Sequence, residues 1–96
     1  MFEVVETLVF AEWIGRLKDH RARARINVRI QRLRGGNFGD HSPVGDGVSE
    51  MWIDYGPGYR VYLTIRGRTV VVLLCGGDKS TQRKDIDKAI ELAKEV

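Results

Sequence analysis

Cysteine is scarce in this sequence, and long hydrophobic runs are missing altogether. Cys75 is the single cysteine among 96 residues, which excludes an intramolecular disulfide, and its place inside an apolar run predicts a buried thiol. No apolar run approaches the roughly twenty residues that a transmembrane helix needs. The N-terminus carries acidic residues where a signal peptide would carry basic ones. We therefore expect a cytoplasmic protein that does not enter a membrane.

Side chains for metal or covalent chemistry are equally few. His20 and His41 are the two histidines, and together with Cys75 they show no spacing typical of a metal site. No serine stands in the context of a Ser-His-Asp triad. The segment from Gly76 to Gln82 looks like a phosphate-binding P-loop, but that pattern requires glycine directly before the lysine, and Asp78 occupies the position. We expect neither a metal nor a cofactor.

Positive charge is concentrated in one part of the chain. Hydrophobic residues make up 43% of the sequence, enough for a single globular domain over residues 1–96, and the net charge is +3. Basic residues crowd the stretch from Arg16 to Arg34, opposed only by Asp19. A solvated helix face, an acidic protein partner and a nucleic acid are the possible explanations. Because all of these residues except Lys18 are arginines, whose planar guanidinium recognises phosphate, we favour a nucleic acid.

Helical periodicity marks three segments. Thr7 and Asp19 can each cap a helix, and apolar residues recur behind both of them at helical spacing. The second stripe stops before a pair of glycines, which commonly end helices. The joint between these two helices is short, so we expect an antiparallel helical hairpin. A third helix should begin at Ser80 or Thr81 and end at Glu95.

Strand-like segments precede and follow the helical hairpin. A short strand should cover residues 2–5, and residues 37–47 read as a loop rich in Gly, Asp and Ser. Three further strands, joined by tight turns, should cover residues 48–54, 59–66 and 68–75. The expected fold class is α+β: an N-terminal strand, a helical hairpin, a three-stranded antiparallel meander and a C-terminal helix. The first strand should pair beside the last, so that the hairpin covers one face of the sheet.

Alternation along the strands predicts which side chains reach the second face of the sheet. Tyr59, Val61, Leu63 and Ile65 share one side of their strand and should belong to the core. The opposite face should gather polar and aromatic residues, namely Glu50, Trp52, Asp54, Arg60 and Tyr62. The ordinary interpretation is a solvated sheet face with an exposed aromatic pair. The functional interpretation is a concave floor that binds phosphates and stacks bases.

The segment Gly76-Gly77-Asp78-Lys79-Ser80 follows the most apolar strand. We expect the two glycines to turn the chain sharply out of the sheet, and Asp78 or Ser80 to cap the last helix. Lys79 would then be free to reach a phosphate beside Arg60. The alternative is an ordinary strand-to-helix turn with a solvated lysine.

Four blocks in the order found here resemble one known family. They are residues 33–40 (LRGGNFGD), residues 43–51 with Pro43-Val44-Gly45 and Glu50-Met51, residues 55–62 (YGPGYRVY) and residues 73–82 (LLCGGDKSTQ). Together they resemble the addiction-module killer proteins, the phage Gp49-like or HigB-like branch of the RelE/ParE toxin superfamily. The resemblance spans essentially the whole chain, and the blocks GPGYRVY and GGDKSTQ are its most specific parts.

The resemblance implies a RelE/ParE-like fold and one half of a type II toxin–antitoxin pair. The partner would be a helix-turn-helix, HigA-like antitoxin from an adjacent gene. RelE-like members cut mRNA in the ribosomal A site, whereas ParE-like members poison DNA gyrase. Most HigB-like relatives are ribonucleases, so we expect a ribosome-dependent mRNA endonuclease in which the RNA 2′-hydroxyl is the nucleophile and no metal takes part. A gyrase inhibitor without nuclease activity and a non-toxic regulator that only binds the antitoxin are the alternatives.

The resemblance also implies roles for individual residues. Arg60 matches the strand arginine that relatives place at the scissile phosphate, and Lys79 lies near a second basic position. Tyr62 is the third residue expected in catalysis. The general acid or base stays open between Lys79, Tyr59 and Tyr62, because Gln82 stands where some relatives have a tyrosine. The residues expected to bind RNA are Arg21, Arg23, Arg25, Arg29, Trp52, Tyr59 and Gln82.

Overall fold

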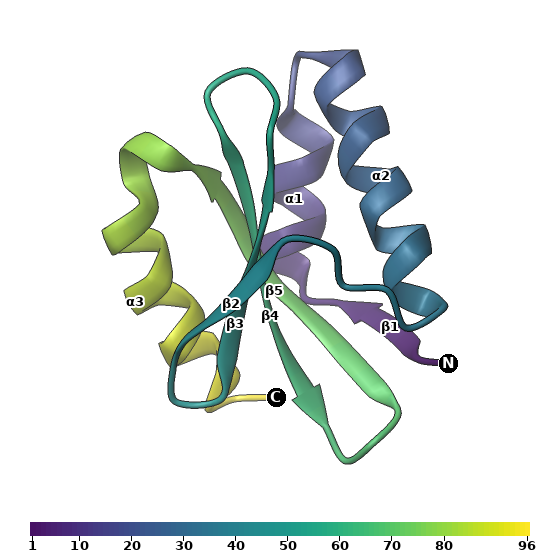
Figure 1. The fold of residues 1–96 in the computed structure, drawn as a ribbon. Helices are drawn as coiled ribbons and strands as arrows, with labels where there is room; N and C mark the ends of the chain where they lie inside the picture. Colours follow the sequence, from purple (N-terminus) through teal and green to yellow (C-terminus); the bar gives the residue numbers. More distant parts are fainter.

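A mixed sheet with helices on both sides forms the protein, as the computed structural model of residues 1–96 shows (Figure 1). The strands are β1 (Glu3–Glu6), β2 (His41–Gly45), β3 (Val48–Ile53), β4 (Tyr59–Arg66) and β5 (Val70–Asp78). The helices are α1 (Leu8–Arg16), α2 (His20–Arg34) and α3 (Gln82–Ala93), and a 3₁₀ turn, η1 (Lys79–Thr81), leads into α3. The α+β class and the predicted order of helices and meander are confirmed.

The five strands lie in the order β1-β5-β4-β3-β2. β3, β4 and β5 make the expected antiparallel meander. β1 pairs with β5 in parallel, with Val4 opposite Val71. The prediction that the first strand lies beside the last is therefore confirmed, and β5 and β4 are interior strands.

The predicted loop before Val48 is wrong in its second half, because β2 forms there and pairs with β3. Pro43 conceals this strand in the sequence, since proline donates no backbone N–H and is tolerated only at an edge such as this one. The pairing also depends on a residue from elsewhere in the chain. Arg29 of α2 donates hydrogen bonds to three carbonyl oxygens, those of Trp52 (2.6 Å), Phe38 (3.0 Å) and Asp40 (3.2 Å).

Side-chain caps begin both helices of the hairpin, as predicted. Thr7 Oγ1 accepts a hydrogen bond from the Phe10 N–H at 3.0 Å. Asp19 Oδ1 accepts hydrogen bonds from the N–H groups of Arg21 and Ala22 at 3.0 and 3.1 Å. The bond from Ala22 lowers the pKa of the Asp19 carboxyl group. The two helices run side by side in opposite directions against one face of the sheet (Figure 1).

Both faces of the sheet are covered, which gives the protein three layers and two cores. The core under α1 and α2 includes Phe10, Ile26, Leu33, Met51, Val61, Val71 and Leu73. The core under α3 includes Val48, Tyr62, Val72, Leu74, Cys75 and Ala89. β5 contributes Val71 and Leu73 to the first core and Val72, Leu74 and Cys75 to the second, with an irregularity in its pairing with β4 at Leu74. Cys75 is 1% exposed, which confirms the prediction of a buried thiol, and this burial raises the pKa of the thiol to about 12.

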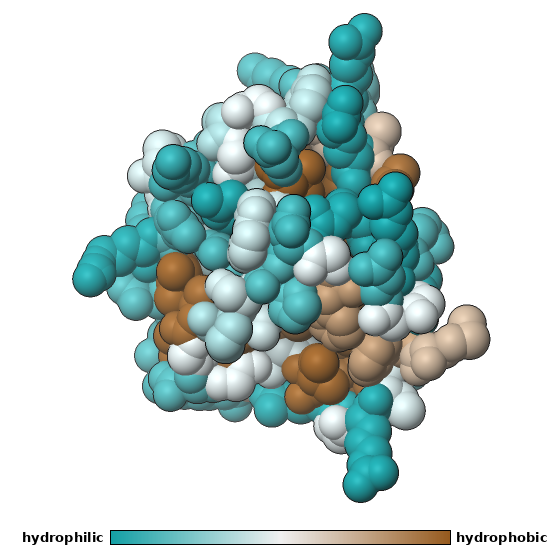
Figure 2. Space-filling model, viewed as in Figure 1, coloured by the Kyte–Doolittle hydropathy of each residue, from teal (hydrophilic) through white to brown (hydrophobic).

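Hydrophilic residues dominate the outside of the molecule. Figure 2 shows one face, on which hydrophobic residues reach the surface only in small separate patches. None of the helices is both long and apolar enough to cross a membrane.

Gly76 and Gly77 do not turn the chain out of the sheet, and that prediction is wrong. Both lie within β5 and pair with β4, and the chain leaves the sheet afterwards at η1. A Cβ on Gly76 would overlap the Trp13 ring, and a Cβ on Gly77 would overlap the Asp85 carboxylate. The two glycines are therefore required for space, on opposite faces of one strand.

Gly76→Ala should lower the free energy of unfolding by about 1–3 kcal/mol, the usual cost of forcing an extra methyl group into a packed site. Gly15→Ala is the matched control, because a Cβ on Gly15 of α1 would have no atom within 4 Å. Removing that helical glycine should instead raise stability by about 0.5–1 kcal/mol. Urea unfolding followed by circular dichroism measures both. A Gly76→Ala variant as stable as the parent would contradict the packing argument.

Candidate functional site

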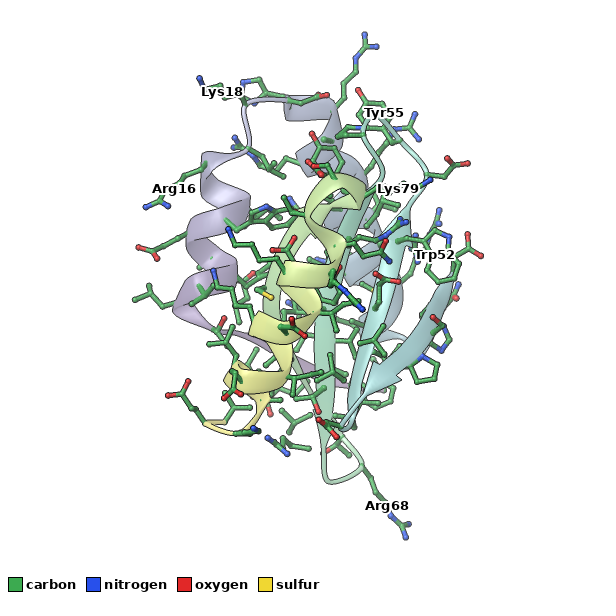
Figure 3. All side chains as sticks on the ribbon, turned by 90° about the vertical axis from the view of Figure 1, so that its left-hand side faces the viewer. Arg16, Lys18, Trp52, Tyr55, Arg68 and Lys79 are labelled. Carbon is green, nitrogen blue, oxygen red and sulfur yellow. The ribbon has the colours of Figure 1, made fainter.

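Two basic residues and a tryptophan lie near the β3–β4 turn at one end of the meander. Arg60 of β4 lies directly opposite Trp52 of β3. Gly58, in the turn between these strands, adjoins the base of the Lys79 side chain and the Arg60 guanidinium: a Cβ placed on it would stand 3.5 Å from the Lys79 Cβ and 3.8 Å from Arg60 Nη1. Figure 3 shows Lys79 and Trp52 along the same edge of the molecule. We refer to Trp52, Gly58, Arg60 and Lys79 as the Arg60–Lys79 site.

The turn after β5 determines where Lys79 stands. Asp78 accepts hydrogen bonds from the Ser80 backbone N–H at 2.8 Å and from the Ser80 hydroxyl at 2.5 Å. These bonds lower the pKa of the Asp78 carboxyl group. Asp78 is therefore the N-cap of η1, and its carboxylate is oriented toward the first residues of that turn. Lys79 is exposed and takes no part in either ion pair of the protein.

Arg60 is held from inside by a buried carboxylate. Its Nε lies 3.5 Å from Glu50 Oε1, within ion-pair range but without the geometry of a hydrogen bond. The same oxygen accepts hydrogen bonds from the Gln82 amide at 2.7 Å and from the Tyr62 hydroxyl at 3.2 Å. The exposed fraction of the side chain is 14% for Arg60 and 7% for Glu50. Arg60 is thus mostly covered, and only its outer end borders the surface.

The prediction that Tyr62 faces solvent is wrong. Tyr62 is 0% exposed and belongs to the core under α3, beside Leu74 and Ala89. Burial, and after it the neighbouring Glu50 carboxylate, raises the pKa of the Tyr62 hydroxyl. Alternation assigns Tyr62 to the correct face of the sheet, but α3 covers that face at this point. Its hydroxyl stays neutral, supports Glu50 and cannot reach a bound RNA.

Tyr62→Phe should lower the free energy of unfolding by about 1–3 kcal/mol, because it removes a donor from a buried carboxylate. Tyr55→Phe is the matched control, since the Tyr55 hydroxyl donates to the exposed Asp19 at 3.2 Å. That change should alter stability by less than about 0.5 kcal/mol. Thermal unfolding of both variants measures the difference. Equal stabilities would mean that the Tyr62 hydroxyl does not support Glu50.

Tyr59, Gln82 and Trp52 occupy different places around Arg60. Tyr59 lies on the opposite face of β4 and packs against Trp13, with ring centroids 6.4 Å apart. Burial raises the pKa of the Tyr59 hydroxyl. Gln82 adjoins Arg60 through Glu50, and Trp52 is half-buried opposite Arg60. The structure therefore brings Trp52 and Gln82, but not Tyr59, to Arg60.

The four arginines of α2 that were expected to bind RNA divide into two groups. Arg23 and Arg29 are partly buried ties: Arg23 Nη2 donates to the Leu17 carbonyl at 2.6 Å, and Arg29 binds the three carbonyls before and within the sheet. Burial lowers the pKa of the Arg29 guanidinium. Arg21 and Arg25 are exposed. Arg21 and Arg25 are thus the exposed arginines of the predicted RNA-binding set.

An open groove of about 640 Å³ separates α2 from the end of β3. Its basic wall comes from α2 and consists of Arg21, Arg25, Arg29 and Arg32. Asp40 and Asp54 also line it, and its apolar lining is Ala24, Val28 and Ile53. The Arg25 guanidinium stands 4.7 Å from the centre of the Tyr55 ring at one end. We refer to these nine lining residues as the basic groove. It opens on the face of the sheet that α2 covers, whereas Arg60 belongs to the face covered by α3.

Glu50 is the residue whose importance the sequence analysis missed. Alternation predicts it on a polar, solvated face, yet it is 5% exposed. The pairing of the meander sets Glu50 opposite Tyr62 and two residues from the pair of Trp52 and Arg60, but it does not indicate that α3 covers this face. Two donors around one carboxylate are typical of a buried polar network.

Comparison with known proteins identifies a full-length relative. No family model matches the chain. An uncharacterized protein from Haemophilus influenzae is 54% identical over 94 residues, a stretch that covers 98% of this chain and 95% of the relative. Identity at this level, over nearly the whole of both chains, reflects common descent. The chain therefore belongs to the same protein family as this Haemophilus influenzae protein.

Proposed function

We propose that this protein is the toxin of a type II toxin–antitoxin pair, in the HigB-like branch of the RelE/ParE superfamily, and that it cuts mRNA on the ribosome. The observation that carries the proposal is the Arg60–Lys79 site, which sets two cations beside one glycine turn with Trp52 opposite Arg60. Such cations suit a phosphate, and an indole suits a stacked base. The mixed sheet with a helical hairpin on one face also suits the RelE/ParE fold that the sequence blocks imply.

Cleavage would begin with attack of an RNA 2′-hydroxyl on the neighbouring phosphorus. Arg60 and Lys79 stabilise the negative charge that builds up on the non-bridging oxygens of the pentacoordinate phosphate. A proton leaves the 2′-hydroxyl, another joins the departing 5′-oxygen, and a cyclic phosphate remains. Because Tyr62 is buried and Tyr59 lies on the other face, we assign to Lys79 the donation of a proton to the departing 5′-oxygen, and water accepts the proton of the 2′-hydroxyl.

We assign the basic groove to the antitoxin. Its arginine wall favours an acidic partner, and Val28, which is 48% exposed within it, offers an aliphatic surface that a protein segment can cover. RNA has no aliphatic side chain for that purpose. The partner chemistry is therefore an acidic segment with apolar residues, supplied by the helix-turn-helix protein of the adjacent gene.

Expression of the toxin with its antitoxin repressed tests the function. We expect growth arrest, with ribosome-bound mRNA cut at positions that primer extension can map. Intact mRNA together with stabilised gyrase–DNA breaks would overturn this proposal in favour of a ParE-like gyrase inhibitor. The burial of Tyr62 favours that second candidate, because it removes a titratable group from the site. Normal growth with retained antitoxin binding would indicate a non-toxic regulator.

A further inference from the structure

Glu50 is the only buried carboxylate in the protein, and it lies directly behind Arg60. We propose that Glu50 is a positioning residue, which fixes the Arg60 guanidinium and the start of α3 so that Arg60 and Lys79 hold one geometry before RNA binds. The catalytic consequence rests on the proposed function. The positioning itself is a property of the free protein.

A single oxygen of Glu50 receives all three contacts. Oε1 lies 2.7 Å from the Gln82 amide nitrogen, 3.2 Å from the Tyr62 hydroxyl and 3.5 Å from Arg60 Nε. A carboxylate taken out of water needs donors and a compensating charge. Gln82 and Tyr62 supply neutral donors, and Arg60 supplies the charge. Arg60 is thus the only partner that neutralises Glu50.

The direction of the Arg60 side chain follows from this arrangement. Its Nε is buried and faces Glu50, whereas its two Nη atoms make no hydrogen bond within the protein and reach the surface. Nη1 adjoins Gly58 in the turn beside Lys79. Because a guanidinium is a rigid plane, holding Nε in place directs both Nη groups outward. The edge that would face a phosphate is therefore oriented in advance.

Through Gln82, Glu50 also fixes the position of the turn that carries Lys79. Gln82 is the first residue of α3 and follows η1, the turn that carries Lys79. Its bond to Glu50 ties this turn to β3, so that β3, β4 and the start of α3 meet at one oxygen atom. Glu50→Gln keeps the shape of the side chain but removes its charge, and should release Arg60 first.

The first measurement follows Arg60 directly and needs no RNA. In the wild-type protein the Arg60 Nε–H signal in NMR spectra should be slow to exchange with water, and in Glu50→Gln its exchange should be about tenfold faster or more. Glu91→Gln is the matched control, because Glu91 forms the other ion pair, with Lys94, at 72% exposure. If Glu50→Gln does not fold, Glu50→Asp provides the comparison. Equal protection of Arg60 in the variant and the wild type would overturn the proposal.

A double-mutant cycle then measures the catalytic consequence. Glu50→Gln should lower kcat for mRNA cleavage on ribosomes about 10- to 100-fold with KM nearly unchanged, the effect of a slightly misplaced catalytic group. The double variant with Arg60→Ala should lose clearly less than the sum of the two single losses, because Glu50 acts mainly through Arg60. Additive losses would overturn the positioning role. A wild-type protein that cuts no RNA would refute the proposed function, and the NMR comparison would still decide the role of Glu50.

Discussion

Arg60→Ala should slow mRNA cleavage about 100- to 1000-fold and relieve the growth arrest that depends on it. Removing one group that stabilises transition-state charge typically lowers kcat about 100- to 1000-fold. Arg60→Lys is the companion variant, because it keeps a charge near Glu50 but loses the planar fork. It should retain the fold and still cut poorly. Single-turnover cleavage of ribosome-bound mRNA measures both, with circular dichroism to confirm folding.

Arg68→Ala is the control for this result. Arg68 lies in the turn between β4 and β5, at the end of the molecule away from Lys79 (Figure 3). It is exposed, so its loss removes the same type of side chain without touching the Arg60–Lys79 site. Cleavage should continue at the wild-type rate. An Arg60→Ala variant that also cuts at the wild-type rate would show that this site is not catalytic.

Reversing the charge of the basic groove should slow association with the antitoxin. The combined variant Arg21→Glu, Arg25→Glu and Arg32→Glu should lower the on-rate about 10- to 1000-fold at low salt, the range over which steering acts. Arg29 is left in place because its three carbonyl bonds hold the approach to β2. Stopped-flow mixing with the adjacent gene product measures the rate. The difference should shrink as salt rises, because salt screens steering between exposed charges.

A second triple variant tests whether slower association arises from the groove itself or only from the change in net charge. Arg16→Glu, Arg68→Glu and Arg83→Glu change the charge by the same amount at exposed positions outside the groove. Equal slowing by both variants would refute a specific role for the groove. Unchanged binding of the groove variant would assign its arginines to the ribosome or to solvent. Arg60→Ala should bind the antitoxin normally, because Arg60 belongs to the other face of the sheet.

Local signals explain why the helical hairpin and the meander could be predicted from the sequence. Thr7 and Asp19 cap helices through bonds to their own next turn, and such bonds need no distant partner. β2 has no comparable signal, because Pro43 weakens it and Arg29 supports it from α2. β2 is stabilised by tertiary contacts, namely its pairing with β3 and the hydrogen bonds from Arg29. No local pattern encodes these contacts, and the loop prediction failed there.

The candidate site also combines features that local sequence signals predict with features that depend on tertiary contacts. Alternation assigned Glu50, Arg60 and Tyr62 to one face correctly, but it carries no information on what covers that face. Ala89 and Ala93 are small residues on α3, and they let the helix approach closely enough to bury Tyr62. Arg60 and Lys79 could be brought together from the sequence because the meander and the following turn are both local. The burial of Glu50 required knowing where α3 lies.

The glycine pair of β5 has a mechanical consequence. Trp13 of α1 presses on the strand from one side and Asp85 of α3 from the other, with only peptide backbone between them. Gly77, one of this pair, is the strand partner of Arg60. The end of a sheet ordinarily frays at little cost. Here helices α1 and α3 pack against β5 from both sides, so we expect the β4–β5 pair beside Arg60 to open less readily than an uncovered sheet end.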